Sequence, residues 1–96
     1  MEKSEETYRI EVDKKFIDDL KNVEESTRRR VKELVDILET NPLFVFNLDI
    51  KKLKGLENIY RLRIGKYRIL LYVDKDNKKI VLLRFLKRKK AYRRST

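Results

Sequence analysis

The segment IYRLRIGKYRILLYV, residues 59–73, constrains the fold more than any other part of the chain. Two runs rich in Ile, Leu, Tyr and Arg flank the dipeptide Gly65-Lys66. A two-residue loop that begins with glycine is typical of a type II′ β-hairpin, because its first position needs a positive φ. The sequence therefore predicts two antiparallel strands, over about 58–64 and 67–73.

A two-residue loop also determines which residues of the two strands lie opposite each other. It pairs Ile64 with Tyr67 and then Arg63 with Arg68, and directly opposed residues share a face of a sheet. One face is then apolar and suited to pack against helices: Tyr60, Leu62, Ile64, Tyr67, Ile69 and Leu71. The other face carries Arg61, Arg63 and Arg68, together with Leu70 and Tyr72.

The arginine pair Arg63–Arg68 is unfavourable for folding, because like charges directly opposite each other destabilise a sheet. A pair that breaks a local rule without a folding gain indicates function. Any single arginine could simply cover a solvent-exposed face. Three of them on one face favour an anion-binding surface.

The rest of the pattern predicts an α+β fold in the order βααβββ, with a curved sheet and both helices on one face. Residues 8–12 alternate as a strand, and Asp13 is a suitable N-cap for a first helix. A second helix over about 24–40 ends at Asn41-Pro42, and its arginines 28–30 are expected on a solvated face, with partner binding as the alternative. We expect one domain over residues 1–96, with 1–6 as a loose tail.

Two segments are harder to assign. Residues 43–57 are too apolar for a free loop, so we expect a partly buried connection that seals one end of the core, with a short strand as the alternative. A last strand is predicted over about 79–86. In it we expect Val81, Leu83 and Phe85 to face the core, and Ile80, Leu82 and Arg84 to lie on the arginine side.

Charge is segregated along the chain. Residues 1–50 hold 9 Lys/Arg and 13 Asp/Glu, whereas residues 51–96 hold 17 and 3, within a total net charge of +10. A proteome rich in Lys and Glu would explain the total but not the asymmetry. We therefore expect a nucleic acid or an acidic protein as partner.

The residue inventory excludes several chemistries. The chain has 96 residues with no Cys and no His, which excludes disulfides, thiolate metal sites and a Ser-His-Asp set. Two glycines cannot form a glycine-rich phosphate loop. We expect neither a metal site nor a cofactor. No apolar run approaches the roughly 20 residues of a membrane span and no signal peptide is visible, so we expect a cytoplasmic protein without membrane contact.

Metal-free RNA cleavage remains open to such a chain. The ribose 2′-OH attacks the adjacent phosphate, with a base at the 2′-OH, cations at the phosphorane and an acid at the 5′ oxygen. Arginines can stabilise the charge but are poor bases. A lysine with a depressed pKa, or Tyr92, would have to transfer the proton.

The chain resembles the RelE/ParE toxin superfamily, and most closely an archaeal RelE. Four fragments carry the resemblance in order: NPL at 41–43, KKLKGL at 51–56, YRLRIGKYRILLYV at 60–73 and LKRKKAYR at 86–93. It implies a type II toxin that inhibits translation as a ribosome-dependent endoribonuclease, cleaving mRNA in the A site. It also implies an acidic RelB-type antitoxin, and contact with operator DNA only through the antitoxin complex.

The resemblance also implies roles for individual residues. Arg61 and Arg63 stand where RelE toxins place catalytic basic residues, often lysines. Arg68 matches a phosphate-binding arginine. Lys87 stands where many relatives have His and is our candidate for proton transfer. The predicted catalytic set is Arg61, Arg63, Arg68, Lys87, Arg88 and Tyr92, and the predicted RNA-binding set is Lys52, Lys54, Arg84, Lys89, Lys90 and Arg93.

Two alternatives follow from the same superfamily. One is a ParE-like inhibitor of DNA gyrase without nuclease chemistry. The other is a protein that acts mainly as an antitoxin-bound transcriptional co-repressor. A supercoiling assay distinguishes the first, and operator binding by the complex distinguishes the second.

Overall fold

A computed structural model describes residues 8–87 of the chain. Its elements follow the predicted order, with a 3-10 helix and one short strand inserted after the second α-helix. They are β1 (Arg9–Val12), α1 (Lys14–Leu20), α2 (Glu25–Thr40), η2 (Pro42–Asn47), β2 (Ile50–Lys52), β3 (Ile59–Ile64), β4 (Tyr67–Asp74) and β5 (Lys79–Lys87). The predicted α+β class is confirmed.

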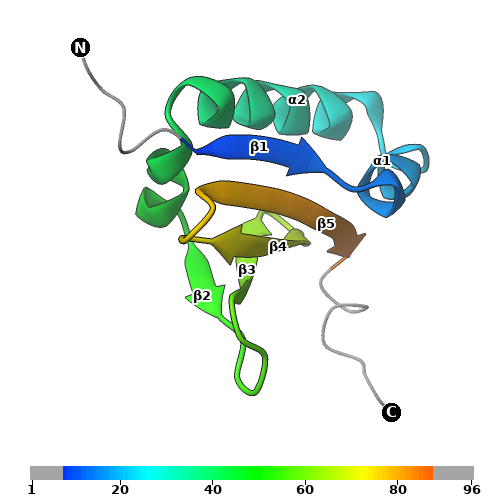
Figure 1. The fold of residues 1–96 in the computed structure, drawn as a ribbon. Helices are drawn as coiled ribbons and strands as arrows, with labels where there is room; N and C mark the ends of the chain where they lie inside the picture. Colours follow the sequence, from blue (N-terminus) through cyan, green and yellow to red (C-terminus); the bar gives the residue numbers. More distant parts are fainter. Residues whose placement is uncertain (1–7, 88–96) are drawn as a thin grey trace.

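The strands form a single sheet in the order β1-β5-β4-β3-β2. β1 pairs parallel with β5, and the other neighbours are antiparallel. Figure 1 shows α2 running alongside β1, while the β2–β3 connection projects away from the helices. The first strand therefore lies at one edge of the sheet, beside the last strand in sequence.

The β3–β4 hairpin has the predicted register. Ile64 pairs with Tyr67, Arg63 with Arg68 and Arg61 with Leu70. Gly65 has φ +58°, the positive value that the first position of a type II′ loop requires. The Gly65-Lys66 dipeptide thus determines the pairing of the two strands that carry the arginines.

Two side chains form hydrogen bonds with backbone groups at the two ends of α1. Asp13 accepts a hydrogen bond from the Lys15 backbone N–H at 3.0 Å and caps the start of α1, as predicted. Arg28 of α2 donates from Nη1 to the carbonyl oxygens of Leu20 (3.2 Å) and Val23 (3.0 Å), at the end of α1. Arg28 is exposed, as expected, but it also ties the two helices together.

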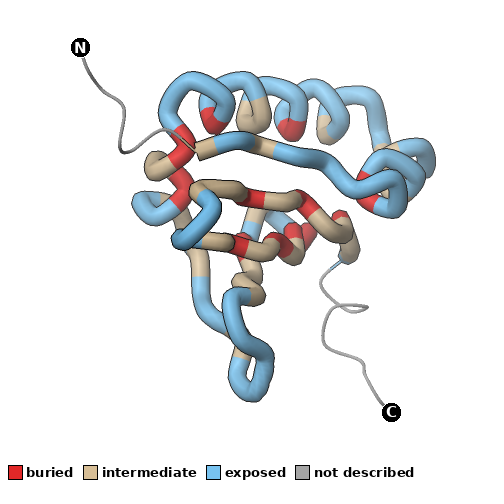
Figure 2. Tube along the Cα trace, viewed as in Figure 1, coloured by how far each residue is buried: buried red, intermediate tan, exposed pale blue. Residues whose placement is uncertain are grey.

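The core lies between the helices and one face of the sheet. β4, in the middle of the sheet, contributes most to it, and Figure 2 shows the buried positions concentrated on β4, β5 and the sheet-facing side of α2. The buried apolar residues are Phe16, Val31, Leu38, Val45, Leu62, Tyr67, Ile69, Leu71, Val73, Ile80, Leu82 and Phe85.

The apolar segment after α2 contains both a buried connection and a short strand, the two structures considered for it. Pro42–Asn47 forms a 3-10 helix that buries Pro42 and Val45 in the core, and Ile50–Lys52 forms a three-residue strand on β3. Phe46 packs edge-on against Tyr60, with 6.1 Å between ring centroids. The segment closes one end of the core, and it also supplies the second edge strand.

The predicted orientation of β5 is wrong over its first half. Ile80 and Leu82 are buried in the core, whereas Val81 and Leu83 are only half-buried. The reason is a β-bulge: β4 pairs Leu70 with Arg84 but Leu71 with Leu82, so Leu83 is an extra residue. The bulge reverses the alternation, and the prediction is correct again for Phe85 in the core and Arg84 on the opposite face.

Candidate nucleic-acid interface

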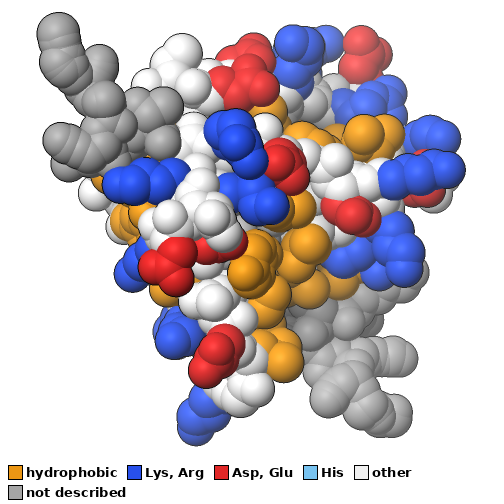
Figure 3. All heavy atoms as spheres, viewed as in Figure 1, with side chains coloured by type: hydrophobic (Ala, Val, Ile, Leu, Met, Phe, Trp, Pro, Cys, Tyr) orange, Lys and Arg blue, Asp and Glu red, His pale blue; other side chains and the backbone are white. Residues whose placement is uncertain are grey.

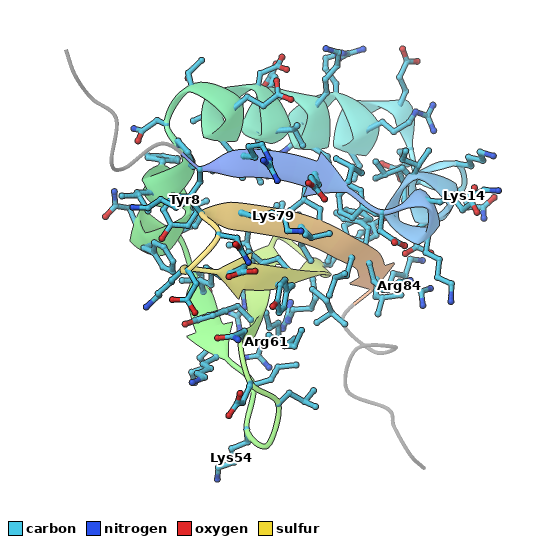
Figure 4. All side chains as sticks on the ribbon, in the orientation of Figure 1. Tyr8, Lys14, Lys54, Arg61, Lys79 and Arg84 are labelled. Atoms are coloured by element: carbon cyan, nitrogen blue, oxygen red, sulfur yellow. The ribbon has the colours of Figure 1, made fainter. Side chains whose placement is uncertain are left out.

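The face of the sheet opposite the helices carries the basic residues of β3 and β4. The register places Arg61, Arg63 and Arg68 on this face, as predicted. Within the described residues it also carries Lys51, because β2 pairs Lys51 with Arg61. We call Lys51, Arg61, Arg63 and Arg68 the arginine face. Figure 4 shows Arg61 on β3, below the paired strands β4 and β5.

Arg63 and Arg68 lie opposite each other but in different environments. The Arg63 side chain is 52% exposed, and its Nε lies 3.5 Å from Asp49 Oδ2. Arg68 is 1% exposed, and its Nη1 donates to the carbonyl oxygen of Tyr67 at 3.2 Å. The three arginines therefore do not form one uniformly accessible surface, because Arg68 is part of the packed structure.

The strand register separates two lysines that are adjacent in sequence. Lys51 lies opposite Arg61 on the arginine face, whereas Lys52 pairs with Tyr60 and shares its face, on the helix side of the sheet. Lys52 was predicted to bind RNA and Lys51 was not. Alternation would have identified Lys51 once the β2–β3 pairing was known, but a three-residue strand gives too weak a pattern to predict that pairing.

The remaining predicted residues are distributed differently. Lys54 lies at the tip of the β2–β3 connection (Figure 4). Lys87 pairs with Tyr67 on the helix side, so the structure does not bring it onto the arginine face. The predicted residues Arg88, Lys89, Lys90, Tyr92 and Arg93 lie outside the described residues.

Arg84 is held in an ion pair that the sequence did not indicate. Its Nε and Nη2 donate to Asp19 of α1 at 2.7 and 3.0 Å. These hydrogen bonds raise the pKa of Arg84 above its ordinary value. Asp19 also accepts from the backbone N–H of Phe85 at 2.9 Å. The guanidinium of Arg84 therefore already has a carboxylate partner. RNA contact by Arg84 stays a prediction.

Hydrophobic side chains occupy the centre of the same face. Leu70, Tyr72, Val81 and Leu86 are half-buried there. In the space-filling view of Figure 3, hydrophobic atoms gather over β4 and β5, with basic and acidic groups around them. A surface with cations beside an aromatic ring and aliphatic side chains can bind a phosphate backbone and contact bases at the same time.

Neither a metal cluster nor a membrane helix is found in residues 8–87. No three Asp or Glu side chains in this range are grouped so that they could hold a metal ion. No helix in this part of the chain is both long and apolar enough to cross a membrane.

A family model for the ParE toxin of type II toxin–antitoxin systems matches residues 10–92. The chain belongs to this family. Among curated relatives, Toxin RelE3 of Methanocaldococcus jannaschii is 42% identical over 80 residues, which span 82% of this chain and 89% of the relative. RelE1 of the same organism is 37% identical over 86 residues, which span 90% of this chain and 96% of that protein.

Solved structures support the same assignment. The RelB–RelE antitoxin–toxin complex of Methanococcus jannaschii matches with a TM-score of 0.75 and 36% identity, covering 85% of this chain and 94% of that chain. The archaeal RelE–RelB complex of Pyrococcus horikoshii matches with a TM-score of 0.70 and 33% identity, covering 85% and 96%. The chain is thus a toxin of a type II toxin–antitoxin system with a RelE-like fold.

Proposed function

We propose that this toxin is a ribosome-dependent endoribonuclease that cleaves mRNA in the A site. The observation that carries the proposal is the arginine face, which combines Lys51, Arg61, Arg63 and Arg68 on two adjacent strand pairs. Planar guanidinium groups bind phosphate oxygens in bidentate geometry. Such a face fits a reaction in which negative charge develops on a phosphate.

The proposed reaction needs only groups of RNA and protein side chains. The 2′ oxygen attacks phosphorus, the bond from phosphorus to the 5′ oxygen breaks, and the products carry a 2′,3′-cyclic phosphate and a 5′-OH. The arginine face stabilises the phosphorane in the transition state, where charge is greatest. Arg61 and Arg63 act by stabilising charge, because guanidinium groups stay protonated.

Proton transfer needs a group other than the arginines, because guanidinium groups stay protonated. Lys87 lies on the helix side at the end of β5, so its ammonium group would have to reach around the strand end to meet the scissile phosphate. Tyr92 and Arg88 follow five residues or fewer later in the sequence. We propose that this basic run supplies the proton-transfer group when mRNA is bound.

The test is cleavage of mRNA on programmed ribosomes by matched arginine variants. We expect Arg63→Met to lower the rate about 100-fold, the usual loss when one donor to an oxyanion is removed. Arg30→Met is the control, because Arg30 is an exposed arginine on α2. An Arg63→Met variant as active as Arg30→Met would remove the arginine face from the reaction.

We also propose a RelB-type antitoxin partner with an acidic segment. The two archaeal structures that match are toxin–antitoxin complexes. On this chain an open groove of about 520 Å³ lies between β1, α1 and α2, with Val12, Phe16 and Ile17 among its lining residues. Arg28, Arg29 and Lys32 also line it, against a single acidic residue, Glu25. An amphipathic segment with acidic residues fits this combination.

A second candidate function is inhibition of DNA gyrase, because the matching family model is that of ParE toxins. The basic face could then bind gyrase or its DNA without cleaving RNA. A supercoiling assay separates the two: we expect the chain to leave gyrase active at concentrations that stop translation. As a co-repressor, it would reach operator DNA only within the antitoxin complex. For each of these functions we propose that the protein acts in the cytoplasm.

A further inference from the structure

A carboxylate, Asp49, lies opposite Arg63 at the edge of the arginine face. β2 pairs antiparallel with β3, and its first residue, Ile50, lies opposite Leu62. The backbone N–H of Arg63 donates to the carbonyl oxygen of Asp49 at 2.9 Å, which extends the pairing by one residue. Directly opposed residues share a face of a sheet, so the Asp49 side chain belongs to the same face as Arg63.

The two side chains form an ion pair through the innermost nitrogen of the guanidinium group. Asp49 Oδ2 lies 3.5 Å from Arg63 Nε, and the Arg63 and Asp49 side chains are 52% and 64% exposed. Nε is the guanidinium nitrogen nearest to the strand, whereas Nη1 and Nη2 form its outer end. The outer pair of nitrogens can bind two phosphate oxygens in bidentate geometry. The contact with Asp49 is compatible with this mode of binding, because it is made at the other end of the group.

The backbone that carries Asp49 is held by the end of η2. Leu48 N donates to Val45 O at 3.1 Å, and Ile50 N donates to Leu48 O at 2.8 Å. Val45 is fully buried, and Leu48 packs against the same core. The Asp49 carboxylate therefore starts from a fixed backbone. The Arg63 side chain has many rotamers, and holding it in one of them costs conformational entropy.

The ion pair has no evident role in folding. Exposed pairs of this kind contribute little to stability. The carboxylates of Asp13, Asp19 and Asp74 each accept a hydrogen bond from a backbone N–H. Within residues 8–87 the Asp49 carboxylate has no such bond and no second ion pair. A carboxylate on a phosphate-binding face also repels the ligand. Its presence there breaks a local rule, which points to a role in the site.

We propose that Asp49 is a positioning residue for Arg63: it holds Nε, so that Nη1 and Nη2 are directed outward to a phosphate before RNA binds. A cation that is already ordered spares this step during the reaction. The effect on cleavage rests on the proposed function, whereas the orientation of Arg63 in the free toxin does not. Asp49 itself touches no reacting atom.

Cleavage kinetics on programmed ribosomes test the role of the carboxylate. Asp49→Ala should lower kcat about fivefold, because Arg63 then has to be ordered in every turnover. KM should not rise, because the loss of a negative charge favours binding of a polyanion. Asp49→Asn keeps an acceptor for Arg63 Nε and should retain more of kcat than the alanine variant. Equal losses in the two variants, or a gain in kcat, would overturn the proposal.

A double-mutant cycle shows whether Asp49 acts through Arg63. In an Arg63→Met background, Asp49→Ala should change kcat less than about twofold, because its partner is already absent. A further loss as large as that in the wild-type background would contradict the proposal.

The matched control is Asp36→Ala. Asp36 is 61% exposed and pairs with Lys32 at 3.7 Å on α2, away from the arginine face. It should leave kcat unchanged. All of these variants should unfold at the urea concentration of the wild type, because exposed ion pairs contribute little to stability. If Asp49→Ala lost stability together with activity, Asp49 would belong to the fold and the proposal would fail.

NMR of the free toxin tests the contact without the reaction. We expect nitrogen relaxation of the Arg63 Nε–H group to show a more mobile guanidinium in Asp49→Ala than in wild type or Asp36→Ala. Equal mobility in the three proteins would overturn the proposal.

The two proposals fail in different ways. A wild-type toxin that leaves ribosome-bound mRNA intact would remove the proposed function, while the relaxation data would still decide whether Asp49 holds Arg63. Normal kcat in Asp49→Ala, with an active wild type, would remove the positioning role and leave the nuclease assignment in place.

Discussion

Arg63 and Arg68 are directly opposed on β3 and β4, yet one side chain is half exposed and the other is buried. The two arginines are therefore not two surface charges that repel each other, because only Arg63 lies at the surface. Arg68 contributes to packing through its aliphatic stem and to hydrogen bonding through Nη1. Arg63 remains accessible to a ligand.

This difference predicts unequal effects on stability. Arg68→Ala should lower the free energy of unfolding by about 1–3 kcal/mol, as for other buried side chains with hydrogen bonds. Arg63→Ala should change it by about 0.5 kcal/mol or less, because an exposed ion pair at 3.5 Å contributes little. Urea unfolding of the two variants measures both values. Equal destabilisation would show that the two arginines share one environment.

The difference in burial between Arg63 and Arg68 also determines what a loss of cleavage in each variant means. A loss of cleavage in Arg68→Ala would report destabilisation of the fold together with the proposed role of Arg68 at the phosphate, whereas a loss in Arg63→Met reports on the surface itself. Arg63 is for this reason the better probe of the proposed site.

The sequence was sufficient to predict the hairpin and the face of its arginines, because a two-residue turn leaves one register. It could not show that Arg68 is buried, since burial depends on what covers a face and not on alternation. The bulge at Leu83 was missed for a related reason: Ile80, Val81, Leu82 and Leu83 are all apolar, so either phase fits the pattern.

Contacts between segments far apart in the chain could not be predicted from the sequence either. Asp19 and Arg84 are separated by 65 residues, and nothing local in either segment marks them as partners. Arg28 was assigned correctly to an exposed face, but its hydrogen bonds to the end of α1 depend on the angle of the helical hairpin.

The β4–β5 turn should make stability depend on pH at the acid end. Asn77 donates to Asp74 from its side-chain Nδ2 (2.8 Å) and from its backbone N (3.0 Å), and these hydrogen bonds lower the pKa of Asp74 below its usual 3.8. A depressed carboxyl pKa stabilises the folded state above the unfolded pKa, and this contribution is lost as pH falls through the folded value.

Asp74→Ala is the corresponding variant. We expect it to unfold at a lower urea concentration than wild type at pH 6–7, with the difference shrinking once the pH drops below about 4. A difference that stays constant down to pH 2 would mean that the Asp74 charge does not stabilise the turn.

We expect antitoxin binding to be sensitive to substitutions in the groove between β1 and the helices. Ile17→Glu should weaken binding of the cognate RelB-type antitoxin at least tenfold, because it places a charge on an apolar contact and repels acidic residues. Leu56→Glu is the matched control: the two residues are 50% and 52% exposed, and Leu56 lies in the β2–β3 connection. Titration calorimetry compares them, and an equal loss in both would argue against this groove.

Antitoxin association should also depend on salt. Attraction between the basic surface of this chain and an acidic segment accelerates encounter, and salt screens it over a Debye length of about 8 Å at physiological ionic strength. We expect the association rate to fall steeply between low and high salt in stopped-flow measurements, with a smaller change in the dissociation rate. An association rate independent of salt would contradict the electrostatic part of the account.

Analysis of the mRNA ends produced on programmed ribosomes tests the proposed nuclease activity itself. We expect cleavage in the A site by wild-type toxin, with a 2′,3′-cyclic phosphate on one product and a 5′-OH on the other, and about 100-fold slower cleavage by Arg63→Met. Intact mRNA with wild-type toxin, or products with 3′-OH and 5′-phosphate ends, would contradict the proposal.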